Sequence, residues 1–185
     1  DIRKNECNWN HMYLICTHNG YQTSSNKIVN KIDIKNYPSV KKYLDKFYKS
    51  LVKREDQGDT PYNLRSCAYM DDLNKPKILY SEIVRSPQFY FDQKGDFIPE
   101  ASAFYLSGQN NEQLCAYLNS YIAAWIFKTF YAGGGLGNDG YRYKKSFLLN
   151  LRIPKNLSND YLKEFKFDQK EIDYINEHIL EFQNN

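Results

Sequence analysis

The 185-residue sequence lacks several patterns on which common functions depend. None of its four cysteines, Cys7, Cys16, Cys67 and Cys115, stands in a Cys-x-x-Cys pair, which argues against a zinc ribbon and a redox dithiol. Cys16 and His18 form a Cys-x-His pair without further ligands, so we expect no metal. No apolar run approaches the roughly 18 residues of a membrane span, and no signal peptide is visible. These absences predict reduced, mostly buried thiols in a cytoplasmic protein.

Motifs for nucleotide binding and catalysis are also absent. Neither GxxxxGK(S/T) nor GxGxxG after a strand occurs, and the glycine-rich stretch follows a predicted helix, whereas phosphate loops precede one. The stretch Asp59-Thr60-Pro61-Tyr62 is one proline short of the motif that grips a flipped adenine, so we interpret it as a turn. Asp160 with Glu164-Phe165-Lys166 only approximates a nuclease motif. With no Ser/His/Asp or Cys/His set, the sequence predicts no active site, cofactor or metal within this chain.

The charge of the chain is distributed unevenly. Residues 156–185 contain three lysines and seven carboxylates, a net −4, and since the whole chain has +3, residues 1–155 carry +7. We therefore divide the chain into a basic domain, 1–155, and an acidic helical extension, 156–185. A basic body favours a polyanionic partner, and an unevenly charged, solvated surface is the alternative.

The segment 132–155, AGGGLGNDGYRYKKSFLLNLRIPK, is the most informative stretch. Five glycines fall within nine residues, and Tyr141, Arg142, Tyr143, Lys144 and Lys145 follow at once. Such glycine density suits a mobile loop, or a backbone that approaches a partner closely. The adjoining aromatic and cationic side chains favour a partner that is anionic and flat-faced. Nucleic acid fits best, and the 17 tyrosines of the chain also favour a binding surface.

Hydrophobic periodicity predicts an α/β (α+β) fold, with a small mixed, partly antiparallel sheet packed with two or three long helices, plus a C-terminal helix. We expect a buried strand at 12–16, a central strand at 77–84, a hairpin formed by 88–92 and 97–98, and a further strand at 103–107. Helices are expected at 37–54 and 111–131, and a short helix carries Arg65 and Tyr69. Asp168 and Glu171 form a capping box that opens the last helix.

The sequence does not decide what two of these helices contact. The helix that opens at Tyr37-Pro38 carries many lysines, which are either a DNA contact or, as we prefer, a solvated face. The last helix has an apolar seam that packs on the body or, less favoured, on another helix of the parent protein. The seam residues are Ile172, Ile175, Ile179 and Phe182. The chain starts at Asp1 without an initiator methionine, so we expect an excised fragment of a longer protein.

Several stretches together resemble one family, the TaqI-like C-terminal specificity domain of type IIG restriction–modification enzymes and related N6-adenine DNA methyltransferases. The resemblance covers most of residues 12–155, and its most specific part is residues 60–69, TPYNLRSCAY. Tyr21 stands where tryptophan is common, and Arg152 where the family often has proline. The other matching stretches are Tyr13-Leu14-Ile15 with Asn19-Gly20, Tyr37-Pro38, Lys75-Pro76-Lys77-Ile78, Glu82-Ile83, Leu118-Asn119-Ser120, the glycine loop and Ile153-Pro154-Lys155.

The resemblance implies a target-recognition domain that closes on double-stranded DNA opposite an N-terminal methyltransferase domain of the same protein, with or without a fused nuclease. That absent domain would use S-adenosylmethionine, and a nuclease would use Mg, to act on the DNA. Phosphate contacts would be sequence-independent, and base choice would need Arg or Lys on guanine, or Asn or Gln on adenine. The candidate DNA contacts are Arg142, Lys144, Lys145, Tyr141 and Tyr143, followed by Arg65, Tyr69 and Arg85.

Other interpretations of these residues stay open at this point. Arg65 is equally well explained by a structural ion pair, for instance with Glu82, and Tyr69 and Tyr143 by core packing. Asn138 and Asp139 are either specificity elements or plain loop residues. A protein–protein interaction module, using the seam of the last helix and the tyrosine-rich surface, is the alternative function.

Overall fold

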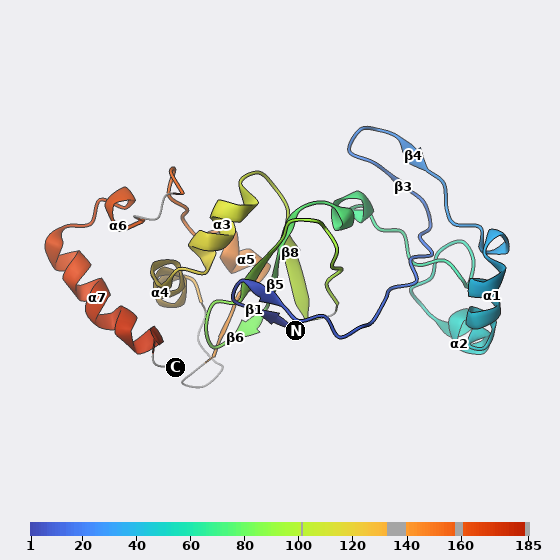
Figure 1. Ribbon diagram of the computed structural model, residues 1–185, viewed down its shortest axis with the longest axis horizontal. Coiled ribbons are helices and arrows are strands. Elements are labelled where there is room, and N and C mark those ends of the chain that lie inside the picture. Colours follow the sequence, from blue (N-terminus) through green and yellow to red (C-terminus); the bar gives the residue numbers. More distant parts are fainter. Residues whose placement is uncertain (101, 133–139, 158–160, 184–185) are drawn as a thin grey trace. The chain divides into compact units, whose positions relative to one another are not determined.

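The computed structural model describes the chain except for residues 101, 133–139, 158–160 and 184–185 (Figure 1). The chain forms two compact units, one made of residues 1–10 and 76–185, the other of residues 11–75. The second unit is therefore inserted into the sequence of the first. Residues on both sides of 155 belong to the first unit, and the division of the chain at 155 stays a prediction.

An antiparallel three-stranded sheet organises the first unit. The central strand expected at 77–84 is confirmed over Lys77–Ser81 as β5, which lies between β7 (Phe89–Asp92) and β8 (Ala103–Leu106), whereas residues 83–84 form a separate strand. Two small antiparallel pairs accompany it, β1 (Ile2–Arg3) with β2 (Glu6–Cys7) and β6 (Ile83–Val84) with β9 (Tyr141–Arg142). Together with the helices described next, these sheets confirm the predicted α/β (α+β) class.

Two helices are found where the sequence predicts one long helix. Helix α3 (Asn111–Leu118) packs on β5 and β7, and α4 (Tyr121–Phe130) follows after a break at Asn119 and Ser120 (Figure 1). Ser120 accepts a hydrogen bond from the amide of Ala123 and so caps α4. The shared core is rich in aromatic rings, among them Phe89, Tyr117, Phe127 and Tyr143, all at most 2% exposed.

The C-terminal part of the first unit is helical. The short helices α5 (Lys145–Leu148) and α6 (Tyr161–Glu164) precede α7 (Gln169–Gln183). The capping box is confirmed, since the amide of Asp168 donates to Glu171 at 2.8 Å and the amide of Glu171 donates to Asp168 at 2.9 Å. Ile175 is buried in the core, and α7 contacts α4. Packing on the body is thus confirmed for Ile175, whereas the side chains of Ile179 and Phe182 lie outside the described residues.

The second unit has little regular structure and a small core. Its elements are the hairpin of β3 (Tyr21–Gln22) and β4 (Ile28–Val29), the 3-10 helices η1 (Ile34–Asn36) and η2 (Met70–Asn74), and helices α1 (Pro38–Asp45) and α2 (Tyr48–Lys53). Among its buried residues are the polar Thr17 and Asn63 and the apolar Ile34 and Met70. Pro38 occupies the first turn of α1, as predicted. The single helix expected at 37–54 is interrupted at Lys46 and Phe47.

Three local predictions were wrong. The apolar run Met12–Cys16 forms no strand and is exposed, with Tyr13 at 84%, and the first buried residue after it is Thr17. The stretch from Arg65 to Tyr69 is irregular, and only Met70 begins a 3-10 helix. Residues 97–98 form no strand, because Asp92 accepts the amides of Asp96 and Phe97 at 3.0 Å and holds the chain in a turn. Asp92 also pairs with Lys77 at 2.7 Å, and both side chains are buried.

The cysteines are less buried than predicted. All four are free thiols, but only Cys115 is buried, while Cys7 and Cys67 are half-buried and Cys16 is exposed. Burial raises the pKa of Cys115 to about 12, so this thiol stays protonated and acts as a small apolar side chain.

Candidate nucleic-acid interface

The β6–β9 pair presents the first group of predicted contact residues. Ile83 lies opposite Arg142 and Val84 opposite Tyr141, and the amide of Tyr143 donates to the carbonyl of Glu82 at 2.7 Å. Successive side chains of an extended chain point to opposite faces. The sequence Tyr-Arg-Tyr-Lys therefore sends its tyrosines to one side and its cations to the other.

The two tyrosines of this pair belong to the core. Tyr141 is 3% exposed and Tyr143 is 2% exposed, and the ring of Tyr143 packs on Phe127 at 4.5 Å and on Phe89 at 4.8 Å between centroids. Burial raises the pKa of the Tyr141 hydroxyl to about 12 and that of Tyr143 well above its ordinary value. These rings offer almost no surface to a ligand, so we leave both out of the contacts proposed below.

The cations of the same region face solvent. Arg85, Lys144 and Lys145 are exposed and Arg142 is half-buried, and we call these four residues the basic ribbon. The Nε of Arg142 is buried and has no hydrogen-bond partner among the residues that the structure describes. A buried, unpaired donor is uncommon in folded proteins. The glycine loop with Asn138 and Asp139 lies outside the described residues.

The TPYNLR stretch of the second unit is a structural centre. Asn63 is 2% exposed, and its side-chain amide donates to the carbonyl of Ile32 at 2.9 Å. The hydroxyl of Thr60 donates to the Asn63 side-chain oxygen at 2.6 Å, and the guanidinium of Arg54 donates to the Asn63 carbonyl at 2.6 Å. One residue thereby joins three separate stretches of the second unit.

Arg65 and Tyr69, the second-tier candidates, lie in different surroundings. Arg65 is exposed and forms a loose ion pair with the equally exposed Asp56 at 3.5 Å, so it has a carboxylate partner within its own unit. An exposed pair of this length contributes little to stability and leaves the guanidinium accessible. Tyr69 is 54% exposed and lines an open hollow together with residues of the β3–β4 hairpin.

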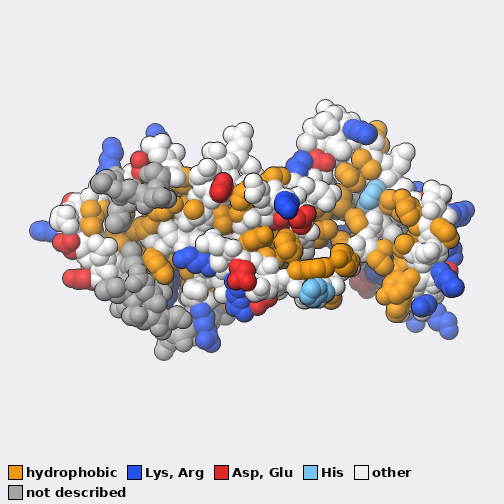
Figure 2. Space-filling view, viewed as in Figure 1, with side chains coloured by type: hydrophobic (Ala, Val, Ile, Leu, Met, Phe, Trp, Pro, Cys, Tyr) orange, Lys and Arg blue, Asp and Glu red, His pale blue; other side chains and the backbone are white. Residues whose placement is uncertain are grey.

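Helices α1 and α2 form a second basic surface. Lys42, Lys46, Lys49 and Lys53 are exposed, and none forms an ion pair in the part of the chain that the structure describes, whereas Lys41 is paired with Asp45 at 2.8 Å. Exposed aromatic rings, among them Tyr43 and Phe47, accompany these lysines. Figure 2 shows blue cationic and orange hydrophobic side chains side by side in the region where Figure 1 places these helices. We call the four lysines the lysine cluster.

A family model for the TaqI-like C-terminal specificity domain matches residues 1–153. The chain belongs to this family. It is therefore a DNA target-recognition domain of the kind found in restriction–modification enzymes. No curated protein matches the chain. Among the described residues, no three His, Cys, Asp or Glu side chains are placed to hold a metal ion, and no helix is long and apolar enough to cross a bilayer.

Some residues in or beside the family-like stretches of this specificity domain serve the fold. Asn119, of the stretch Leu118-Asn119-Ser120, accepts the amide of Phe89 at 3.0 Å and donates to its carbonyl at 2.8 Å. Gly58, just before the TPYNLR stretch, leaves no room for a side chain, since a Cβ would lie 2.6 Å from the carbonyl oxygen of Leu64. Asn119 and Gly58 thus have structural roles in this domain.

Sequence reasoning missed the β3–β4 hairpin of the specificity domain, as it missed the short β1–β2 pair. Residues 22–36 are polar and show no clear period, so they carry no strong signal for a strand. The signal that could have found the hairpin is the sequence Ser24-Ser25-Asn26-Lys27, a cluster of turn-forming residues between short stretches that favour strands.

Proposed function

We propose that this specificity domain binds duplex DNA and selects the target sequence for an N6-adenine methyltransferase domain of the same protein, as in type IIG restriction–modification enzymes. The observation that carries the proposal is the basic ribbon, where Tyr141 and Tyr143 are anchored in the core and the cations beside them face solvent. An anchored backbone holds these cations at defined positions, as contacts to a regular phosphate backbone require.

The lysine cluster on α1 and α2 supports the same proposal from the second unit. Its four exposed lysines have no carboxylate partners in the described part of the chain, so their charge is available to phosphates. Phosphate contacts supply most of the sequence-independent affinity of DNA-binding proteins. The DNA would thus be held by cations from both units, each acting on the phosphates that it reaches.

The methylation chemistry would belong to a domain outside this sequence. That domain would bind S-adenosylmethionine and flip the target adenine out of the duplex, and a fused nuclease would use Mg. The residues of the present chain would position the duplex and choose its sequence. An enzyme of this kind would act on DNA in the cytoplasm.

The test is duplex-DNA binding by fluorescence anisotropy at several salt concentrations. The wild type is compared with the triple variant Arg142→Ala/Lys144→Ala/Lys145→Ala. Removing one phosphate-binding cation should flatten the log–log salt dependence by about one unit. We expect the triple variant to bind more weakly and with a slope that is flatter by roughly two to three units.

A matched control variant, Lys94→Ala/Lys155→Ala/Lys170→Ala, removes the same charge from exposed positions of the same unit outside the basic ribbon. It should keep the slope of the wild type to within about one unit. Equal weakening in the two variants would mean that only net charge matters, and the basic ribbon would not be the contact. Absence of binding at low salt would refute the DNA-binding function itself.

A further inference from the structure

We infer that the β3–β4 hairpin is the base-reading element of this domain, entering the major groove with Gln22 directed at adenine and Lys27 at guanine. The inference rests on the proposed function and adds the part that phosphate contacts cannot supply. Lysines on phosphates position a protein but carry no sequence information, so sequence must be read by other side chains.

The shape of the hairpin suits this role. Tyr21 pairs with Val29 and Gln22 with Ile28, in an antiparallel two-stranded ribbon connected by residues 23–27. The major groove of B-DNA is about 12 Å wide and admits either an α-helix or a two-stranded β-ribbon. A ribbon of two strands, with no third strand paired to it in the described chain, fits the second geometry.

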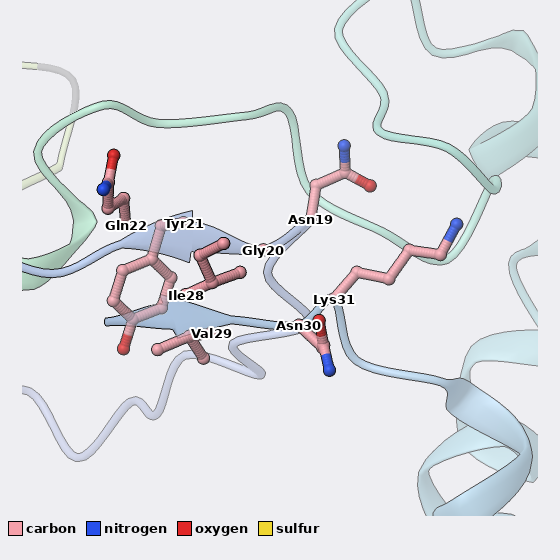
Figure 3. A pocket seen from close by; sticks show the side chains of 8 residues that line it. All are labelled: Asn19, Gly20, Tyr21, Gln22, Ile28, Val29, Asn30 and Lys31. Carbon is pink, nitrogen blue, oxygen red and sulfur yellow. The ribbon is translucent and has the colours of Figure 1, made fainter. Parts of the chain in front are cut away.

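The base of the hairpin is held rigidly. Gly20 has a φ of +83°, and a Cβ there would lie 3.0 Å from the carbonyl oxygen of Val29, so only glycine fits without strain. Below it, the amide of Ile32 donates to the carbonyl of His18 at 3.1 Å, and Lys31 pairs with Asp59 at 2.5 Å. Figure 3 shows this end of the hairpin, with Lys31 extending away from the strands.

The tip of the hairpin is also fixed. The amide of Thr23 donates to the carbonyl of Lys27 at 2.9 Å, and the hydroxyl oxygen of Thr23 accepts the Lys27 amide at 3.0 Å. Ser24 donates through both its amide and its hydroxyl to the carboxylate of Asp71 at 3.0 Å. Base readout needs side chains at defined positions, and fastening at both ends provides them.

The exposed face of the hairpin carries groups that match base edges. Gln22 and Asn26 are exposed amides, and Gln and Asn bond adenine through its N6 and N7. Lys27 is exposed at the tip, and Ile28, opposite Gln22, is 75% exposed and can contact a thymine methyl group. Tyr21 and Val29 point to the other side, as Figure 3 shows. Residues 17–32 contain no acidic side chain, and the carboxylate of Asp71 at the tip is paired with Lys75 at 2.6 Å.

The hairpin also adjoins Tyr69, one of the candidate DNA contacts. Tyr69 lines an open hollow together with Gln22, Ser24 and Asn26 of the hairpin. The hollow gathers amide, hydroxyl and aromatic side chains together with the carboxylates of Asp71 and Asp72, both of which are paired with Lys75. Such a set suits contacts to sugars and bases at the rim of a groove.

The experiment is selection from a library of randomised duplexes, followed by sequencing of the bound DNA. The wild type is compared with Gln22→Ala/Lys27→Ala, whose side chains make none of the bonds described above; the Gln22 amide donates only to the exposed Asn26 side chain, at 3.5 Å. The control is Gln93→Ala/Lys94→Ala, which removes an exposed amide and an exposed lysine from the turn after β7. We expect the wild type and the control to enrich one common sequence. The hairpin variant should lose roughly 5- to 150-fold preference at one or two of its positions.

A further variant, Gln22→Glu, keeps the side-chain length and removes the amide donor. A carboxylate accepts from the N4 amino group of cytosine, so the preference should move from adenine toward cytosine at one position. Enrichment of the wild-type sequence by either hairpin variant would overturn the inference, as would wild-type binding without any preferred sequence. Wild type that binds no duplex at all would instead refute the proposed function, and the base-reading role with it.

Discussion

The side chain of Asn119 occupies a position in the core that only an amide satisfies. It is 3% exposed, and it bonds both the amide and the carbonyl of Phe89 in addition to the side chain of Asn5. The Asn119 side chain therefore takes the place of a backbone hydrogen-bond partner for Phe89, the first residue of β7. The backbone at Asn119 ends α3 so that its side chain can reach Phe89, and Ser120 then begins α4.

We predict that Asn119→Ala strongly destabilises the first unit. It leaves the buried amide of Phe89 without its acceptor, which costs about 1–3 kcal/mol, whereas the carbonyl of Phe89 keeps the amide of Asn5 as a donor at 3.0 Å. The free energy of unfolding, measured by urea denaturation, should fall accordingly. The control Asn150→Ala removes an exposed amide that bonds only the nearby Ser146 carbonyl, so its effect should stay within about 0.5 kcal/mol. Equal stability of the Asn119 variant and the wild type would contradict the role given to this amide.

Individual contact residues were predictable only in part. The cations Arg142, Lys144 and Lys145 were proposed from their place beside the glycine loop, and they remain candidates because their charges face solvent. Tyr141 and Tyr143 were proposed for the same reason, yet both are buried. Alternation along an extended chain was visible in the sequence, but the sequence does not say which face meets the core.

At the scale of elements, strong local signals gave correct predictions. The apolar run of β5, the strand β8 and the capping box of α7 each depend on a few adjacent residues that agree with the final packing. The exposed run Met12–Cys16 shows the limit of such signals. Its composition resembles that of a buried strand, and burial depends on partners distant in sequence that composition does not reveal.

We predict that the fastening between the β3–β4 hairpin and η2 is lost in acid. The ammonium group of Lys75 and the amide of Ser24 together lower the pKa of Asp71 from 3.8 to about 2. Because the pKa is lower in the folded state, the fastening stabilises the fold above pH 4 and is lost as the pH falls from about 4 to 2.

The measurement is the pH titration of the Ser24 amide resonance by NMR. Its midpoint should lie near pH 2, and Asp71→Asn should abolish the titration while leaving Ser24 a weaker, neutral acceptor. A midpoint near 3.8 would show that Asp71 is not held by Lys75 and Ser24 in solution.

At the scale of the whole molecule, the two units differ in what holds them together. The first has a large core of aromatic and aliphatic side chains, whereas the second depends on hydrogen bonds converging on the buried Asn63. A unit with few buried apolar side chains is stabilised less by the hydrophobic effect, so it should open at a lower free energy than its neighbour.

We predict that Asn63→Ala destabilises the second unit alone. Without this amide the carbonyl of Ile32 loses its donor, and the Thr60 hydroxyl loses its acceptor. In hydrogen exchange, protection of the Leu64 amide, which donates to the Thr17 carbonyl, should fall about tenfold or more. The Tyr143 amide of the first unit should keep its protection, and Asn36→Ala at an exposed site should change neither. A parallel loss at both amides would mean that the two units unfold as one.

The insertion of residues 11–75 between two parts of the first unit has an evolutionary consequence. Only two peptide connections, near residues 10 and 75, join the inserted unit covalently to the rest of the chain. Recombination at these two points would replace the whole hairpin-bearing module and leave the aromatic core of its host unaltered. A lineage could therefore acquire a new target sequence in one genetic event, without first evolving a new scaffold.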